Sequence, residues 1–356
     1  MANNSRNPIK VVVFGLLIFG LVFMASHSVF KAFGQEDQIT LRGKTMGTTY
    51  HVKYIDKDLK LSPKDVQKNI DDLLKIVNQQ MSTYIPNSEL SRFNQFKEIN
   101  TPFAVSEDLA KVVAEAIYLN KVTDGALDVT VGPLVNLWGF GPEKRLNKAP
   151  TKEQILARQK WVGVDKLKVL ELNHQYYLEK SIPQLYVDLS SIAKGFGVDK
   201  VAQYLESLGI QNYLVEIGGE IFAKGVNEDE IPWQIAIEKP RFDGQTEVET
   251  VIGLNGLAMA TSGNYRNYFE QNGKRFSHEI DPKTGETIQH RLASISVIAK
   301  NTMIADGLST GLFVLGEDKA LAVAEKLHLP VFLIIKNKDG FEVKMSSYLE
   351  KEINKD

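Results

Sequence analysis

The chain has 356 residues, of which 43% are hydrophobic and 24% are charged, a composition typical of globular proteins rather than disordered or fibrous ones. Its formal net charge of −2 shows no basic excess of the kind that nucleic-acid binding needs, so we expect no nucleic-acid partner. Cysteine is absent, which excludes disulfides, thiolate metal sites and thiol nucleophiles. The six histidines form no HExxH pair, which argues against a zinc hydrolase.

Residues 1–34 differ from the rest of the chain. Arg6 and Lys10 precede Val11–Ala25, an uncharged and mostly apolar run. Extended to Phe30, the run has about twenty residues, which is enough to cross a bilayer. The pattern predicts a signal anchor that stays in the membrane, and cleavage as a signal peptide is the alternative. In both cases the positive flank remains in the cytoplasm, and residues 35–356 form one extracytoplasmic domain.

The rest of the chain alternates irregularly between helix and strand patterns. Ser62 and Pro63 are typical of a helix N-cap and first position, and Thr151–Gln154 is a capping box. Apolar residues at helical or alternating spacing predict the other elements. The predicted helices begin at 62, 106 and 151 and span Ile192–Leu208, Thr302–Leu315 and Asp318–Leu327; the predicted strands are Leu41–Tyr54 with an internal turn, Leu167–Leu172, Tyr176–Glu179, Tyr186–Leu189, Tyr213–Ile217, Trp233–Glu238, Val248–Leu254, Ser294–Ala299, Val331–Lys336 and Phe341–Met345.

This irregular order predicts an α+β fold rather than a doubly wound parallel sheet. No GxGxxG follows a predicted strand, which argues against a Rossmann nucleotide site. The chain shows no internal repeat and no interdomain linker.

Two segments are richer in glycine and polar residues than a structural role requires. Gly125–Pro133, followed by Trp138, offers small residues that admit a ligand to the backbone and aromatic residues for a ring system. Val187–Gly197 joins a strand to a helix whose first turn offers free N–H groups, hydroxyls and Lys194 to an anion. Each also has a structural interpretation, as a tight turn with a core tryptophan or as an N-cap.

Three further clusters carry candidate chemistry. Gly218 and Gly219 interrupt a strand pattern, which predicts a bulge or a close approach to a ligand. His278 lies in a polar, turn-forming segment and is the best candidate for a general base, although a turn histidine is the alternative. Asp306 and Thr310 lie four apart on one face of a predicted helix and offer the oxygen ligands that Mg²⁺ prefers, or else solvate a helical turn.

Together and in this order, these segments resemble the FAD:protein FMN transferase (ApbE) family over residues 40–346. Any one motif is short, but seven in register are specific. The matching motifs are Lys44-Thr45-Met46-Gly47-Thr48, Met81-Ser82-Thr83-Tyr84 with Ser88-Glu89-Leu90, Gly125-Ala126-Leu127-Asp128-Val129-Thr130, Asp188-Leu189-Ser190-Ser191-Ile192-Ala193-Lys194-Gly195, Glu216-Ile217-Gly218-Gly219-Glu220, Ser277-His278-Glu279-Ile280-Asp281-Pro282 and Ala305-Asp306-Gly307-Leu308-Ser309-Thr310.

The resemblance implies an α+β, ApbE-like flavin transferase fold with FAD in a central cleft, here preceded by one N-terminal hydrophobic anchor helix. It implies transfer of FMN from FAD to a Ser or Thr hydroxyl of an acceptor flavoprotein, with Mg²⁺ at the pyrophosphate and AMP as the leaving group. The expected acceptors are flavoprotein subunits of membrane redox complexes of the Na⁺-translocating NADH:quinone reductase or Rnf type. The catalytic domain is then expected on the periplasmic side of a bacterial inner membrane. Many relatives are lipoproteins anchored through a cysteine, which this chain lacks.

By position, the resemblance assigns Asp306 and Thr310 to the metal, with a third oxygen from the hydroxyl or the backbone of Ser191. His278 is the candidate base or phosphate-orienting group, and Asp306 is counted as catalytic with it. The residues expected along FAD are Met46, Tyr84, Ala126, Leu127, Asp128, Asp188 and Lys194. Two alternatives remain. One is an FAD pyrophosphatase that uses the same metal site to release FMN and AMP, and the other is a non-catalytic periplasmic flavin-binding protein. Mn²⁺ is an alternative to Mg²⁺ because both accept oxygen ligands.

Overall fold

The computed structural model describes residues 38–55, 59–142, 149–240, 246–263, 268–271, 274–338 and 340–353. The predicted anchor segment, residues 1–34, lies outside this part of the chain. None of the helices within the described ranges is long and apolar enough to cross a membrane.

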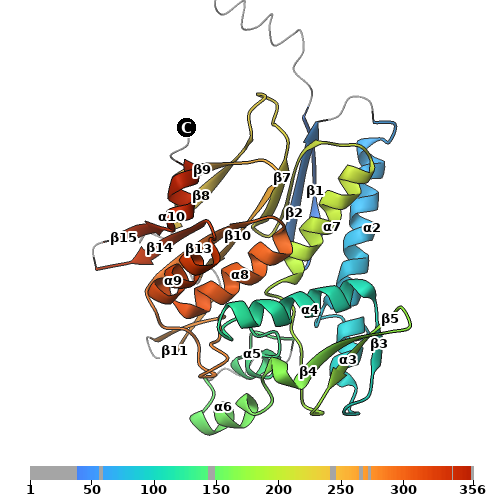
Figure 1. Ribbon diagram of the computed structural model, residues 1–356, viewed down its shortest axis with the longest axis vertical. Helices are drawn as coiled ribbons and strands as arrows, with labels where there is room; N and C mark the ends of the chain where they lie inside the picture. Colours follow the sequence, from blue (N-terminus) through green and yellow to red (C-terminus); the bar gives the residue numbers. More distant parts are fainter. Residues whose placement is uncertain are drawn as a thin grey trace, which may run out of the picture.

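An eight-stranded sheet organises the described chain (Figure 1). Its strand order is β1-β2-β6-β7-β10-β13-β14-β15, and each neighbouring pair is antiparallel. The strands are β1 Gln38–Thr45, β2 Thr48–Ile55, β6 Asn212–Ile217, β7 Glu220–Lys224, β10 Leu257–Gly263, β13 Leu292–Ala299, β14 Val331–Lys336 and β15 Phe341–Met345. The mixture of this sheet with helices confirms the predicted α+β class.

Helices pack against the sheet. Figure 1 shows α2 (Pro63–Met81) and α7 (Ala193–Ser207) beside β1 and β2, and α8 (Thr302–Leu315) beside β10. The other helices are α3 Glu89–Gln95, α4 Glu107–Val122, α5 Gly132–Trp138, α6 Lys152–Gln159, the 3₁₀ turn η1 Val164–Lys166, α9 Glu317–Leu327 and α10 Ser347–Ile353. Smaller sheets pair β3 (Phe103–Val105), β5 (Gln175–Lys180) and β4 (Leu167–Leu172), then β8 (Trp233–Pro240) with β9 (Thr246–Leu254), and β11 (Tyr268–Gln271) with β12 (Lys274–Ser277).

Local capping explains where the helices begin. The Ser62 side chain accepts the Asp65 N–H at the start of α2, and Ser106 caps α4 in the same way. The predicted capping box at Thr151 and Gln154 is present with both of its hydrogen bonds. These contacts satisfy N–H groups that the first helical turn otherwise leaves without a partner, so the predicted helix starts are confirmed.

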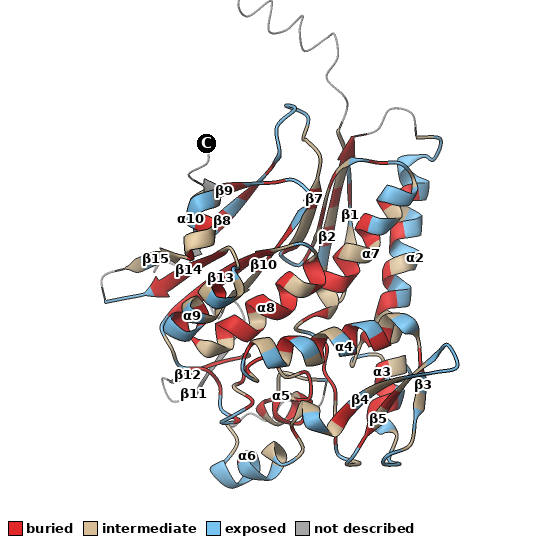
Figure 2. Ribbon diagram, in the orientation of Figure 1, coloured by how far each residue is buried: buried red, intermediate tan, exposed pale blue. Residues whose placement is uncertain are grey.

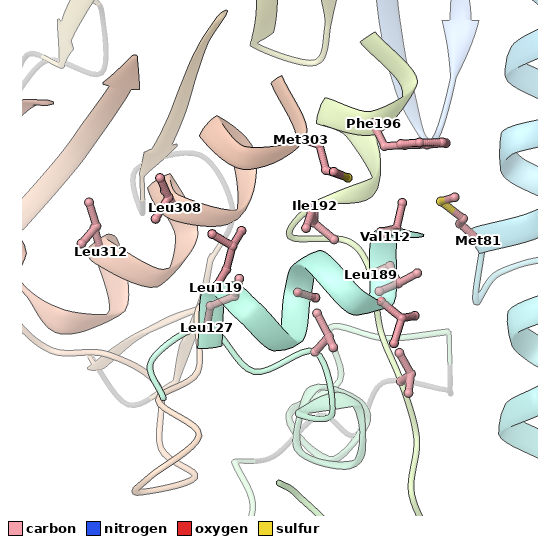
Figure 3. Packing of buried hydrophobic residues seen from close by; sticks show 14 of the residues in the cluster. Met81, Val112, Leu119, Leu127, Leu189, Ile192, Phe196, Met303, Leu308 and Leu312 are labelled. Atoms are coloured by element: carbon pink, nitrogen blue, oxygen red, sulfur yellow. The ribbon is translucent and has the colours of Figure 1, made fainter. Parts of the chain in front are cut away.

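The largest hydrophobic core lies where α4, α7 and α8 meet (Figure 3). Leu119 of α4 packs there with Leu127, Ile192 and Leu308. Figure 2 shows buried faces along α7 and α8, while α2 and α6 carry exposed faces that point outward. The core therefore joins the two helices that carry the candidate phosphate and metal residues.

Trp138 belongs to a separate core cluster rather than to a ligand wall. It packs with Leu134 and Phe276, and its indole N–H donates to the carbonyl of Gly285 at 2.9 Å. The structural interpretation of this tryptophan is therefore correct.

The predicted strand at Tyr186–Leu189 is wrong, because this segment is irregular. A side chain, not a neighbouring strand, pairs its backbone: the Asn94 amide donates to the carbonyl of Val187 at 2.8 Å and accepts the N–H of Val187 at 2.8 Å. Val187 and Leu189 are buried all the same. An alternating apolar pattern indicates burial, and it does not show whether the backbone pairs with another strand.

The predicted bulge at Gly218 and Gly219 is also wrong. The two glycines form the turn of the β6–β7 hairpin, in which Ile217 pairs with Glu220. Both have positive φ, 60° and 105°, as a two-residue hairpin loop of type I′ requires.

The sequence does not predict β10, whose residues are mostly small and include one β-branched side chain. The strand forms because β7 and β13 hydrogen-bond to its two edges. Ala258 and Ala260 are fully buried, and with Ala305 of α8 they form a core cluster of small side chains. Tertiary packing thus overrides a weak local preference.

Lys180 is a fully buried lysine at the end of β5, with 1% of its surface exposed. Its ammonium donates to the carbonyls of Phe93, Asn94 and Leu185 at 3.0, 3.3 and 3.5 Å. Burial lowers the pKa of Lys180 to about 8. These bonds tie α3 to the irregular segment that leads into the cavity described below.

We expect Lys180 to make the chain more stable as the pH rises from about 8 to 10.5, because the unfolded state binds more protons in that window. Relative to Lys180→Met, the free energy of unfolding of the unmodified chain should rise by roughly 3 kcal/mol at most across the window. Denaturant unfolding at both ends of the window measures the difference. Lys168→Met, an exposed change on the adjacent strand, is the control, and parallel pH profiles for the unmodified chain and Lys180→Met would refute the prediction.

Candidate active site

A cavity of about 370 Å³ lies where α7, α8, β7 and β10 meet the loops of residues 126–128, 188–191 and 278–282. Ten of the predicted site residues line it: Tyr84, Ala126, Leu127, Asp128, Asp188, Ser191, Lys194, His278, Asp306 and Thr310. Met46, the remaining predicted residue, lines an adjacent cavity of about 530 Å³. Tyr84, Asp188 and Lys194 border both cavities, so the whole predicted set is brought together in two neighbouring spaces.

Three charged side chains meet inside the wall of the first cavity. The ammonium of Lys194 lies 2.5 Å from Oε1 of Glu220 and 3.7 Å from Oδ1 of Asp306. Both carboxylates are almost fully buried, at 3% and 2% exposure. Burial raises the pKa of Glu220 to about 8 and also raises that of Asp306, while the nearby ammonium opposes both shifts. Burial alone would lower the pKa of Lys194, but the two carboxylates outweigh it and the pKa is raised.

The position of Asp306 depends on the close packing of α7 and α8. Oδ2 of Asp306 accepts the backbone N–H of Gly195 at 2.9 Å. Asp199, one turn further along α7, accepts the N–H groups of Thr302 and Met303 at 2.8 and 2.9 Å, which fixes the start of α8. The anionic charge of Asp306 therefore lies against the N-terminal turn of α7, where it is favoured.

Hydroxyl groups surround the side of α8 that faces the cavity. Thr310 lies one turn after Asp306, as the sequence predicts, and both line the cavity. Ser262 of β10 lies within hydrogen-bonding distance of Ser309, 2.9 Å between the two Oγ atoms, and 3.4 Å from Oγ1 of Thr310. The hydroxyl of Ser309 in turn donates to the carbonyl of Asp306 at 2.9 Å. This part of the wall is an array of oxygen atoms.

Two aspartates of the cavity loops are held by turns of their own backbone. Oδ1 of Asp188 accepts the N–H of Ser190 at 2.9 Å, so Asp188 shapes the loop before α7 and does not cap that helix. Oδ1 of Asp128 accepts the N–H and the hydroxyl of Thr130 at 2.8 and 2.5 Å. Burial raises the pKa of Asp128, and these hydrogen bonds counteract the rise.

Tyr84, Phe140 and His278 form an aromatic part of the cavity lining. Tyr84 is 65% exposed, and its hydroxyl donates to the carbonyl of Phe140 at 3.1 Å. The ring of His278 contacts the Phe140 ring edge-on, with 6.3 Å between centroids, and Nε2 of His278 lies 3.2 Å from Oε1 of Glu279. Tyr84 and His278 therefore flank Phe140, and a large exposed ring borders both cavities.

Met46 has a backbone conformation that is unusual for a residue with a side chain. With Gly47 it forms the β1–β2 turn, and its φ of 49° is left-handed. Such strain persists where the surrounding structure holds the residue in place, and it often occurs at functional sites. The side chain of Met46 lies near α7, since a Cβ added to Gly197 would be 3.0 Å from its terminal methyl carbon.

The donor set of this cavity fits Mg²⁺. Asp306 supplies a carboxylate, and Thr310 and Ser191 supply hydroxyls. In the ranges that the structure describes, no three His, Asp or Glu side chains cluster as a metal-binding group. A cation here would therefore be held by one carboxylate with hydroxyl and carbonyl oxygens, a hard set of the kind that Mg²⁺ accepts while keeping several waters.

The model of the ApbE family matches residues 46–333 of this chain. The chain belongs to the ApbE family. The FAD:protein FMN transferase of Haemophilus influenzae is 61% identical over 337 residues, which are 94% of this chain and 97% of that protein. The predicted membership of a flavin transferase family is therefore confirmed, and this ApbE-family chain is an enzyme.

Solved structures of ApbE-family proteins agree with the fold. The flavin transferase ApbE from Vibrio cholerae is 53% identical, with a TM-score of 0.82 over 89% of this chain and 99% of that one. The flavinyl transferase ApbE of Pseudomonas stutzeri, in its apo form, is 37% identical, with a TM-score of 0.81 over 90% and 98% of the two chains. The predicted ApbE-like fold is thus confirmed for the described residues.

Glu220 and Ser262 line the cavity, although the sequence does not assign either of them to the site. Glu220 belongs to a motif that supports the family resemblance, but its contact with Lys194 depends on how α7 lies against β7. Ser262 lies in an unpredicted strand, β10, and contacts α8. The local signal for Glu220 in the sequence is its place directly after the pair Gly218-Gly219. Its burial, which is rare for a glutamate without a partner, is visible only in the structure.

We expect Gly195→Ala to separate α7 from α8. The added Cβ would lie 2.3 Å from the carbonyl oxygen of Thr302 and 2.8 Å from Cβ of Asp306, so the helices must shift. The free energy of unfolding should fall by about 1–3 kcal/mol, which denaturant unfolding measures. Gly340→Ala is the control, since a Cβ added there would meet no heavy atom of the described residues within 4 Å apart from its chain neighbours. Unchanged stability of Gly195→Ala would show that the helix contact is not tight.

Proposed function

We propose that this ApbE-family enzyme transfers FMN from FAD to a Ser or Thr hydroxyl of an acceptor flavoprotein, with Mg²⁺ bound and with AMP as the leaving group. The observation that carries the proposal is the pair of cavities that share Tyr84, Asp188 and Lys194. FAD has a ring system at each end and a pyrophosphate between them, so two neighbouring spaces with a cationic side chain on their common border match its shape and charge. Their volumes, about 370 and 530 Å³, are in the range of small-molecule sites.

In this proposal Asp306, Thr310 and Ser191 hold the Mg²⁺, which when bound neutralises charge on the pyrophosphate oxygens. Lys194 adds a fixed positive charge at the same wall, where its ammonium is kept protonated by two carboxylates. Asp128 and Asp188 shape the loops that border the flavin nucleotide. Tyr84, which is largely exposed, packs against a ring of FAD.

The proposed reaction is an exchange of one P–O bond for another. The acceptor hydroxyl oxygen bonds to the FMN-side phosphorus, the bond from this phosphorus to the bridging oxygen breaks, and AMP leaves with that oxygen. His278 accepts the hydroxyl proton, since its ring lies beside Phe140 and lines the same cavity as Asp306 and Thr310. Lys194 compensates the charge that develops on the leaving phosphate.

The proposal extends to the place of the reaction. The N-terminal pattern of Arg6 and Lys10 before an apolar run supports an anchor in a bacterial inner membrane with residues 35–356 on the periplasmic side. Acceptors on that side would be flavoprotein subunits of membrane redox complexes, such as those of the Na⁺-translocating NADH:quinone reductase or Rnf type.

We expect Asp306→Ala to lower FMN transfer by at least ~10²-fold while the fold is retained, because a metal carboxylate at the reacting phosphate is lost. Intact mass spectrometry of an acceptor domain incubated with the enzyme, FAD and Mg²⁺ measures transfer, alongside AMP release. Asp318→Ala, an exposed carboxylate in the first turn of α9, is the matched control. Full transfer by Asp306→Ala in chelating buffer would refute the metal assignment, and free FMN with an unmodified acceptor would indicate hydrolysis instead.

We expect His278→Ala to reduce the rate of transfer by ~10²–10⁴-fold without weakening FAD binding, because removal of a general base affects the chemical step. Single-turnover transfer at saturating FAD measures the rate, and flavin fluorescence measures binding. His174→Ala, in the exposed β4–β5 turn, is the control. A parallel loss of FAD affinity would assign His278 to binding rather than to proton transfer.

A further inference from the structure

Glu220 is a buried carboxylate that the reaction as proposed does not use. It is the first residue of β7, directly after the turn of Gly218 and Gly219, and it lines the cavity. Its Oε1 lies 2.5 Å from the ammonium of Lys194, and its Oε2 is buried with no hydrogen-bond partner among the described residues. A buried carboxylate is costly unless a nearby charge compensates it, so its position against Lys194 calls for an explanation.

Lys194 lies between two carboxylates but is held by one of them. The 2.5 Å contact with Glu220 is a short charge-assisted hydrogen bond, whereas the 3.7 Å distance to Oδ1 of Asp306 exceeds a hydrogen bond. The other oxygen of Asp306, Oδ2, is bonded to the N–H of Gly195. Oδ1 of Asp306 therefore stays near an ammonium that does not bond to it, on the wall that Thr310 also lines.

We propose that Glu220 is a positioning residue that holds the Lys194 ammonium away from Asp306 and thereby leaves Oδ1 of Asp306 free to bind the cation. This inference rests on the proposed function, because the cation is the one that Asp306 and Thr310 are proposed to hold. Glu220 acts through Lys194 and is not itself a ligand.

The charges of the three groups explain why this matters. With all three ionised, Lys194, Glu220 and Asp306 sum to one negative charge, which favours a divalent cation. Without the charge of Glu220 the sum is zero, and the ammonium is then attracted to Asp306, the single anion left beside it. Cation binding would have to displace that ammonium.

The backbone keeps Glu220 in this position. Ile217 and Glu220 are paired at the closed end of the β6–β7 hairpin, and both turn glycines have positive φ. A Cβ on Gly218 would lie 2.8 Å from the Thr48 side chain and 3.4 Å from the Lys194 side chain, so the turn fits tightly between β2 and α7. The carboxylate of Glu220 is thus presented by a rigid turn to a helix that is distant in sequence.

The test measures Mg²⁺ binding to the full-length protein by titration calorimetry without FAD, above the pKa of Glu220 of about 8 so that its carboxylate is ionised. We expect Glu220→Gln to raise the Mg²⁺ dissociation constant at least ~10-fold, because the ammonium pairs with Asp306. The double variant Glu220→Gln/Lys194→Met, which again has one net negative charge, should return to within about threefold of the unmodified protein. Glu228→Gln, a change of an exposed glutamate in the turn after β7, is the matched control and should bind Mg²⁺ normally.

Two results would overturn the inference. Normal Mg²⁺ binding by Glu220→Gln would show that Lys194 needs no restraint, and a double variant as weak as Glu220→Gln would make Glu220 a ligand. Lys194→Met alone should bind Mg²⁺ at least as tightly as the unmodified protein, and it decides the question if Glu220→Gln fails to fold; weaker binding by Lys194→Met would also overturn the inference. Absence of Mg²⁺ binding by the unmodified protein would instead contradict the proposed metal site itself.

Discussion

The buried carboxylate of Asp306 is the group on which the rest of the site depends. Its charge is tolerated inside the protein because the N–H of Gly195 and the ammonium of Lys194 compensate it. The hydrogen bond from Gly195 requires α7 and α8 to lie so close that no side chain fits at residue 195. A second carboxylate, that of Asp199 in α7, fixes the same helix pair at the first turn of α8. Helix packing and the electrostatics of the cavity are therefore a single constraint.

Around this helix pair, the cavity walls are irregular segments that side chains hold in place. Asn94 replaces a strand partner for Val187, and Asp128 fixes its loop through Thr130. The hydroxyl of Thr130 also accepts the N–H of Gly163, which links that loop to the segment after α6. Loops held on a rigid scaffold can present many polar groups to a ligand without exposing unpaired backbone inside the protein.

Local sequence signals predicted α2, α4, α6, α7, α8 and α9 but not α3, α5 or α10, and they worked because caps and apolar spacing are short-range features. Ser62, Ser106 and the box at Thr151 each act within three residues, so no tertiary information is needed. The same reasoning failed at Tyr186–Leu189, where burial without strand pairing gives the same apolar pattern. It also missed β10, which forms because of its two neighbours and not because of its own residues. Among site residues, spacing placed Asp306 and Thr310 on one helical face, which the structure confirms.

The sequence by itself determined the class of the fold, the family and the helix that carries Asp306, because motifs and apolar periodicity involve residues that are close together in the chain. Only the tertiary structure decided which residues that are distant in sequence form hydrogen bonds and ion pairs with one another. Gly195 and Asp306 are 111 residues apart, and Asn94 and Val187 are 93 apart, yet each pair is joined by hydrogen bonds of 2.8–2.9 Å. Such contacts follow from the path of the chain through the sheet and its helices. That path depends on the packing of the whole core, which no single segment specifies.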